Sequence, residues 1–103
     1  MSLKVYISGK ITGDPDYRKK FQMEESVLRE AGHIVLNPAK TPEGLRPVDY
    51  MRVCFAMMEA ADLVLFLPNW QDSKGARLEM AWCQYVGKPT AFEVKGLALE
   101  AAT

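Results

Sequence analysis

The chain has 103 residues, 49% of them hydrophobic, and its 13 Lys and Arg residues balance 13 Asp and Glu residues. A chain of this length fits one domain with a modest apolar core. Zero net charge argues against a binder of nucleic acid polymers or of membrane surfaces, because both need a basic face.

The two cysteines, Cys54 and Cys83, stand in apolar segments and are expected to be free, buried thiols. Neither has a second Cys or a His at the spacing of a metal site, so we predict no metal and no cofactor. No segment resembles a signal peptide or approaches the roughly 18 apolar residues of a membrane span. We therefore expect a cytoplasmic protein.

The first part of the chain reads as strand, helix, strand. Residues 3–8 are β-branched and aromatic and predict a strand. Asp16 is expected to cap a helix over residues 17–31, which Gly32 ends. Residues 33–36 predict the second strand.

The second part repeats the alternation. Helices are predicted over residues 48–61 and 75–86. Residues 62–67 are apolar without alternation, so this third strand should be buried on both faces. Residues 89–94 predict a fourth strand, and the weakly patterned residues 95–103 are expected to form a tail or a short helix.

We take residues 1–94 as a single domain in which strands and helices alternate. This pattern predicts an α/β fold: a flavodoxin-like or Rossmann-like three-layer sandwich, with a four-stranded parallel sheet in the order 2-1-3-4. The loops after the first and third strands would meet at the switch point, where such sheets bind ligands.

The segment over residues 50–61 is apolar nearly all round. One face should cover the sheet, whereas the face with Val53 and Met57 has no obvious partner in so small a domain. This pattern indicates a homodimer or a higher homo-oligomer. The alternative is a deeply packed helix in which Met fills gaps.

The most informative segment runs from Asp72 to Glu79, between the third strand and its helix. It offers free backbone N–H groups, a positive helix end and small residues that let a ligand approach. Glu79, one turn into the helix, would face that ligand as a nucleophile. Alternatively, Glu79 only complements the helix dipole.

Two phosphate-binding motifs are absent. Lys4 stands where G-x-x-x-x-G-K-[ST] needs its first glycine, and no G-x-G-x-x-G occurs. The sequence therefore does not support a P-loop enzyme or a dehydrogenase. The lone His33 begins a strand, and we interpret it as structural.

Three segments carry a family resemblance: residues 5–13, residues 61–64, and residues 73–79 with the spacing Ser-x-Gly-x-x-x-Glu. In this order they resemble the nucleoside 2-deoxyribosyltransferase superfamily over residues 3–92. The nearest relatives look like a small branch found in bacteria and phages. The superfamily also contains 2′-deoxynucleoside 5′-phosphate N-hydrolases.

The resemblance implies catalytic roles for three residues. Glu79 would attack the anomeric carbon of a (deoxy)ribose and form a glycosyl-enzyme, which water or a second base resolves. Tyr6 would lie beside the sugar and Glu79. Asp62 would help to protonate the leaving base. The alternatives are purely structural roles: Tyr6 would fill the core, and Asp62 would be a solvated residue at a strand start.

The resemblance also implies substrate-binding residues. Ser73 and Gly75 match the loop that holds the sugar 5′-group or its phosphate, although Ser73 is also a natural helix N-cap. The first loop would line the base pocket with Ser8, Gly9 and Ile11. Further candidates from the two loops are Lys10 and Arg77 as phosphate contacts, Asn69, and Trp70 as a stacking platform.

Two features depart from the family. Arg77 stands where the enzymes often carry Gly, so it would either bind a phosphate or block the sugar. Lys10 replaces a usual Pro. The first hypothesis is cleavage or transfer at the N-glycosidic bond of a nucleoside or its 5′-phosphate. Its rivals are a non-catalytic nucleotide binder and an interaction module that uses the apolar helix.

Overall fold

The computed structural model describes residues 2–95 and 98–101. The strands are β1 (Lys4–Ser8), β2 (Ile34–Leu36), β3 (Leu63–Phe66), β4 (Thr90–Lys95) and β5 (Ala98–Ala101). The α-helices are α1 (Tyr17–Glu30), α2 (Pro47–Ala60) and α3 (Lys74–Val86), and two short 3₁₀ helices are η1 (Pro38–Lys40) and η2 (Trp70–Asp72).

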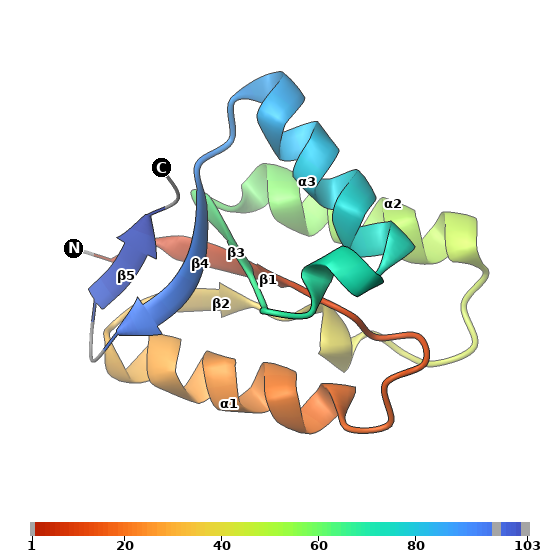
Figure 1. The fold of residues 1–103 in the computed structure, drawn as a ribbon, viewed down its shortest axis with the longest axis horizontal. Coiled ribbons are helices and arrows are strands. Elements are labelled where there is room, and N and C mark those ends of the chain that lie inside the picture. Colours follow the sequence, from red (N-terminus) through yellow and green to blue (C-terminus); the bar gives the residue numbers. More distant parts are fainter. Residues whose placement is uncertain (1, 96–97, 102–103) are drawn as a thin grey trace.

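The strands form one sheet in the order β2-β1-β3-β4-β5 (Figure 1). The first four are parallel, which confirms the predicted order 2-1-3-4 and the flavodoxin-like fold. β5 is antiparallel to β4 and lies where a tail or a short helix was expected. Its four residues have little strand signal of their own, and pairing with the edge of β4 supplies the backbone partners that local propensity does not.

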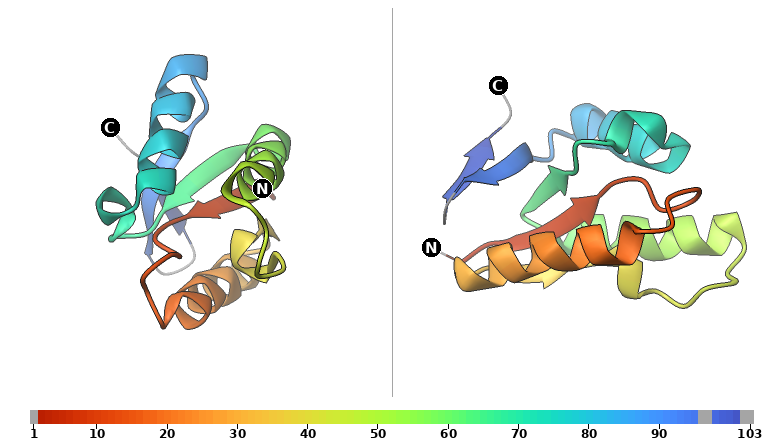
Figure 2. Two further views of the ribbon diagram at one scale, coloured as in Figure 1. Left: turned by 90° about the vertical axis from the view of Figure 1, so that its right-hand side faces the viewer. Right: turned by 60° about the horizontal axis from the view of Figure 1, so that its bottom comes forward.

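Helices cover both faces of the sheet (Figures 1 and 2). β1 points Val5 and Ile7 toward Phe21 and Leu28 of α1 in one apolar cluster. Its alternate residue Tyr6 joins the opposite cluster, to which α2 and α3 contribute Cys54, Met58, Met80 and Cys83. All of β3 is buried, as the run without alternation predicted.

Local signals set the ends of the helices. Ser73 caps α3 by accepting a hydrogen bond at its Oγ from the N–H of Ala76, at 3.1 Å. Asp16 occupies the N-cap position of α1, but its side chain makes no capping bond. Instead, the N–H of Asp16 donates to Asp14 Oδ1 at 2.9 Å, so the turn is stabilised two residues earlier than predicted.

Two further residues have structural roles. A Cβ on Gly9 would lie 2.9 Å from Cδ1 of Leu67, so glycine lets the loop after β1 pass close to the end of β3. Nδ1 of His33 accepts a hydrogen bond from the N–H of Leu3 at 3.1 Å, as expected of a structural histidine. Within the described ranges, no helix has the length and apolar character needed to cross a membrane.

Candidate functional site

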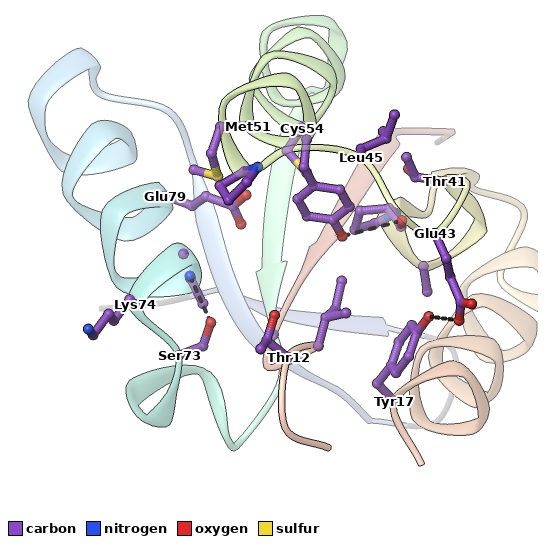
Figure 3. A pocket seen from close by; sticks show the side chains of 18 of the residues that line it. Thr12, Tyr17, Thr41, Glu43, Leu45, Met51, Cys54, Ser73, Lys74 and Glu79 are labelled. Atoms are coloured by element: carbon purple, nitrogen blue, oxygen red, sulfur yellow. Dashed lines mark hydrogen bonds between the residues drawn. The ribbon is translucent and has the colours of Figure 1, made fainter. Parts of the chain in front are cut away.

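A cavity of about 660 Å³ opens at the carboxyl edge of the sheet (Figure 3). Its lining comes from the loop after β1, from η1 and the loop that follows it, and from the first turns of α2 and α3. This size is in the usual range of sites for small molecules. The position is the one that the parallel sheet predicts for a ligand.

Glu79 is the buried acidic group of this cavity, with only 5% of its surface exposed. Its Oε2 accepts a hydrogen bond from the hydroxyl of Tyr6 at 2.9 Å, and its Oε1 accepts one from Ser8 Oγ at 2.6 Å. A glutamate that only complements the helix dipole would be solvated. Burial and two donors from β1 instead point to a carboxylate held in one orientation for a ligand.

Burial and the two hydrogen bonds act in opposite directions on the acidity of Glu79. Burial raises the pKa of Glu79, the bonds from Ser8 and Tyr6 lower it, and the net direction is upward. Burial and the charge of Glu79 together raise the pKa of Tyr6 well above its usual value. Tyr6 therefore stays protonated, and its hydroxyl remains a hydrogen-bond donor to the Glu79 carboxylate.

Two thiols lie beside this pair, and the prediction that both are free and buried is confirmed. Burial raises the pKa of Cys54 to about 11 and that of Cys83 to about 11, so both are neutral at physiological pH. Within the ranges that the structure describes, no cluster of three or more His, Cys, Asp or Glu side chains could hold a metal ion.

The cavity has two unlike sides. On one side lies the start of α3, with Ser73 and Lys74, and Gly75 also lines it. Thr41, Glu43 and Tyr17 lie on the other side, as Figure 3 shows. The first side offers the N-terminus of α3, which suits an anionic group, whereas the Lys74 side chain points away from the cavity in Figure 3. The second side, with the Tyr17 ring, the Thr41 hydroxyl and the Glu43 carboxylate, suits a flat group that also makes hydrogen bonds.

The structure corrects the assignment of Asp62. This residue stands at the amino end of β3, where its Oδ2 accepts a hydrogen bond from the N–H of Lys4 at 2.9 Å. The cavity lies at the carboxyl ends of the strands, so the length of β3 separates the Asp62 carboxylate from Glu79. Its structural reading, a solvated residue at a strand start, is the one that the geometry supports.

Four further candidates also lie outside the cavity lining. Trp70 packs against Phe66, with ring centroids 5.5 Å apart, and stacks on Phe92 at 6.4 Å. Asn69 ties the two loops together, because its Oδ1 accepts from the N–H of Lys10 at 3.3 Å and its Nδ2 donates to Asp14 at 3.4 Å. Arg77 is exposed on α3 and does not obstruct the cavity. The side chain of Lys10 does not line the cavity either.

The remaining candidates lie at the same cavity as Glu79. Tyr6, Gly9, Ile11, Ser73 and Gly75 line the cavity, and Ser8 reaches Glu79 from β1. Sequence reasoning missed the wall that follows β2, including Pro38, Ala39 and Thr41, and the α2 residue Tyr50. The signal was Asn37-Pro38 directly after a predicted parallel strand, because loops at that edge meet the same ligand.

Comparison with known proteins agrees with this architecture. A 2-deoxyribosyltransferase from the psychrotolerant bacterium Bacillus psychrosaccharolyticus superposes with a TM-score of 0.69 at 21% identity, over 91% of this chain and 77% of that one. A 2-deoxyribosyltransferase from Leishmania mexicana gives a TM-score of 0.69 at 15% identity, over 94% of this chain and 77% of that one. At such identities the likeness shows a shared fold.

A search of curated protein sequences gave no match. A match at the level of sequence families covers residues 3–92, almost the whole of the domain described above. The chain therefore belongs to the family described as Domain of unknown function (DUF4406).

Proposed function

We propose that this protein cleaves or transfers at the N-glycosidic bond of a nucleoside or its 5′-phosphate, with Glu79 as the nucleophile. The observation that carries the proposal is the buried Glu79 carboxylate, oriented by Tyr6 and Ser8 inside a cavity of about 660 Å³. The 2-deoxyribosyltransferases that share the fold support the same reaction class.

The proposed reaction has two displacements. A Glu79 oxygen forms a bond to the anomeric carbon while the carbon–nitrogen bond breaks, and that electron pair leaves with the base, which takes up a proton from water. Water or a second base then attacks the same carbon, gives up a proton to solvent and releases the Glu79 carboxylate. The Tyr6 and Ser8 hydroxyls hold the carboxylate in place as positive charge develops on the sugar ring.

We favour hydrolysis of a 5′-phosphorylated substrate over transfer between free nucleosides. The start of α3 brings Ser73 and Gly75 to the cavity, and the N-terminus of a helix suits a phosphate. The Lys74 side chain points away from the cavity in Figure 3, and Lys10 and Arg77 lie outside its lining. The proposed phosphate contacts are therefore the backbone N–H groups at the start of α3.

The test is a panel of nucleosides and their 5′-phosphates, in which release of free base is followed by chromatography. We expect Glu79→Gln to abolish release while the variant still binds substrate. Asp62→Asn is the matched control and should retain activity, because Asp62 lies at the far end of β3. Undiminished release by Glu79→Gln would remove Glu79 as the nucleophile.

A second candidate function is non-catalytic binding of a nucleotide. It is favoured by one observation: among the described residues that line the cavity, Glu79 is the only buried carboxyl group. No second buried carboxylic acid is then at hand to protonate the departing base. This alternative predicts that nucleotides raise the thermal midpoint without base release, and that Glu79→Gln leaves their binding unchanged.

We also propose that the chain self-associates through α2. Val53 is 37% exposed, and Met57 is partly buried beside it. Sedimentation at micromolar concentration should then give a species larger than a monomer, and Val53→Asp should shift it to the monomer. A monomer at all concentrations would contradict this proposal.

A further inference from the structure

One buried carboxylate has no place in the proposed chemistry. Glu25, on α1, is only 2% exposed and lies outside the cavity lining. Its Oε1 accepts a hydrogen bond from Asn37 Nδ2 at 2.9 Å. Its Oε2 accepts one from Arg29 Nε at 2.7 Å and one from Lys40 Nζ at 2.9 Å. In some proteins, a buried charge bonded to distant segments fixes how those segments lie relative to one another.

Two of the three partners lie at the two ends of one short helix. Asn37 precedes η1 and Lys40 is its last residue. Asn37 Oδ1 also accepts a hydrogen bond from the N–H of Ala39 at 2.9 Å, so the amide group of Asn37 links Glu25 directly to the backbone of η1. Glu25 is therefore bonded to both ends of this helix.

The same short helix forms a wall of the cavity. Pro38, Ala39 and Thr41 line it, and the carbonyl of Pro38 accepts a hydrogen bond from the hydroxyl of Tyr50 at 3.5 Å. We refer to residues 38–41 as the wall segment. A three-residue 3₁₀ helix has few internal bonds and does not hold its position alone. Its placement has to come from side-chain anchors, and Glu25 bonds to two of them.

We propose that Glu25 is a positioning residue that fixes the wall segment, and through it the side of the cavity that receives the base of the substrate. The second part rests on the proposed function. The wall faces Ser73 and Lys74 across the cavity (Figure 3), so a substrate with its phosphate at α3 directs its base toward the wall. Glu25 thus acts on binding, whereas Glu79 acts on bond cleavage.

The chain contains an internal control for this inference. Arg29 and Lys40 donate to the same oxygen of Glu25, and their side chains are similarly exposed, at 58% and 60%. Arg29 lies on α1 itself, four residues from Glu25, so removing it leaves the wall segment attached. Lys40 belongs to the wall segment. The two substitutions remove the same charge from the same carboxylate and differ only in the element that is released.

The first measurement is amide hydrogen exchange in the ligand-free protein. We expect Glu25→Gln and Lys40→Gln to speed exchange at Ala39 and Thr41 by about tenfold or more, because local opening of the wall becomes easier. Arg29→Gln should leave those amides within about twofold of the wild type. Unchanged exchange at these amides in both Glu25→Gln and Lys40→Gln would overturn the inference. If Glu25→Gln does not fold, the exchange rates of Lys40→Gln alone decide the test.

The second measurement uses the nucleotide that the base-release panel identifies. Glu25→Gln and Lys40→Gln should raise KM about fivefold or more with kcat within about twofold, as expected when uniform binding is lost. A fall in kcat at constant KM would contradict positioning through the wall. If no nucleotide is bound or cleaved, the proposed function fails, and hydrogen exchange still decides whether Glu25 holds the wall segment.

Discussion

The hydroxyl of Tyr6 donates to Oε2 of Glu79 across 2.9 Å, although the two residues are 73 positions apart in the chain. The bond joins β1 to α3 at the floor of the cavity. Each partner changes the other: the charge of Glu79 helps to raise the pKa of Tyr6, and the Tyr6 hydroxyl lowers the pKa that burial raises in Glu79. Tyr6 therefore tunes the basicity of the proposed nucleophile.

Removing that hydroxyl should change the pH dependence of activity. In Tyr6→Phe, burial of Glu79 is opposed by Ser8 alone, so the pKa of Glu79 should rise further. The acidic limb of the kcat/KM profile should move to higher pH, and the plateau should fall by about 10–100-fold, as when one donor to a reacting charge is lost. Tyr85→Phe is the control, since Tyr85 is 92% exposed. An acidic limb that does not move would separate Tyr6 from the ionisation of Glu79.

Replacing Glu79 should stabilise the fold at neutral pH. Burial raises its pKa, so the folded state binds a proton more tightly than the unfolded state does. The stability that Glu79 contributes is present below the unfolded pKa of about 4.5 and is lost as pH rises through the folded pKa. Glu79→Gln removes this loss and should raise the thermal midpoint at pH 7, by about 4–8 °C for each kcal/mol gained.

This prediction is checked by thermal unfolding at pH 7 and at pH 4. The advantage of Glu79→Gln should shrink at the lower pH, where wild-type Glu79 is protonated more of the time. Glu59→Gln, at an exposed position on α2, should behave like the wild type at both values. A lower midpoint for Glu79→Gln at pH 7 would mean that the bonds to Tyr6 and Ser8 outweigh the burial of the charge.

The alternation of strands and helices predicted both the parallel sheet and the closeness of Ser8 and Glu79 in the cavity. The carboxyl ends of parallel strands share one edge, so Ser8 at the end of β1 and Glu79 in the helix after β3 were expected to be close. Asp62 failed by this rule, because it begins its strand and so lies at the opposite edge. The strand predicted over residues 62–67 already began at Asp62, and the catalytic role came from the motif match alone.

Other outcomes depended on packing between distant segments. An aromatic residue in a loop can turn toward a ligand or toward its own sheet, and Trp70 turns toward Phe66 and Phe92. β5 forms because the edge of β4 offers it backbone partners. The anchoring of the wall segment by Glu25 is also invisible in sequence, since an i,i+4 pair with Arg29 explains that glutamate without any partner outside α1.

The network around Glu25 should make stability depend on acid. Burial alone raises the pKa of Glu25, but hydrogen bonds from Asn37, Arg29 and Lys40 lower it from 4.5 to about 2. Because the folded pKa is lowered, this stability is present above pH 4.5 and is lost as pH falls toward about 2. Glu25→Gln should destabilise the protein by about 1–2 kcal/mol at pH 7, since the cations are exposed and screened.

Urea unfolding of the wild type and of Glu25→Gln across this range measures the effect. The difference between the two proteins should be largest at pH 7 and should shrink between pH 4.5 and about 2. Glu24→Gln is the neighbouring control: burial raises the pKa of Glu24, so its substitution should not destabilise the protein at neutral pH. A difference that is constant with pH would mean that packing of Glu25, rather than its charge, provides the stability.

Thr41 should separate stability from binding. Its Oγ1 is buried and has no hydrogen-bond partner within the described part of the chain, and the residue lines the cavity. A buried polar atom without a partner is unfavourable, so Thr41→Val, nearly equal in shape, should leave stability unchanged or raise it by up to about 1 kcal/mol. Affinity for the nucleotide should fall by about fivefold or more if the ligand forms a hydrogen bond with this hydroxyl.

Calorimetric titration measures the affinity and thermal unfolding measures the stability. Ser26→Ala, at an exposed position on α1, should change neither. A loss of stability above about 1 kcal/mol would show that the Thr41 hydroxyl already has a hydrogen-bond partner in the ligand-free protein. The hydroxyl would then not need a ligand as its partner.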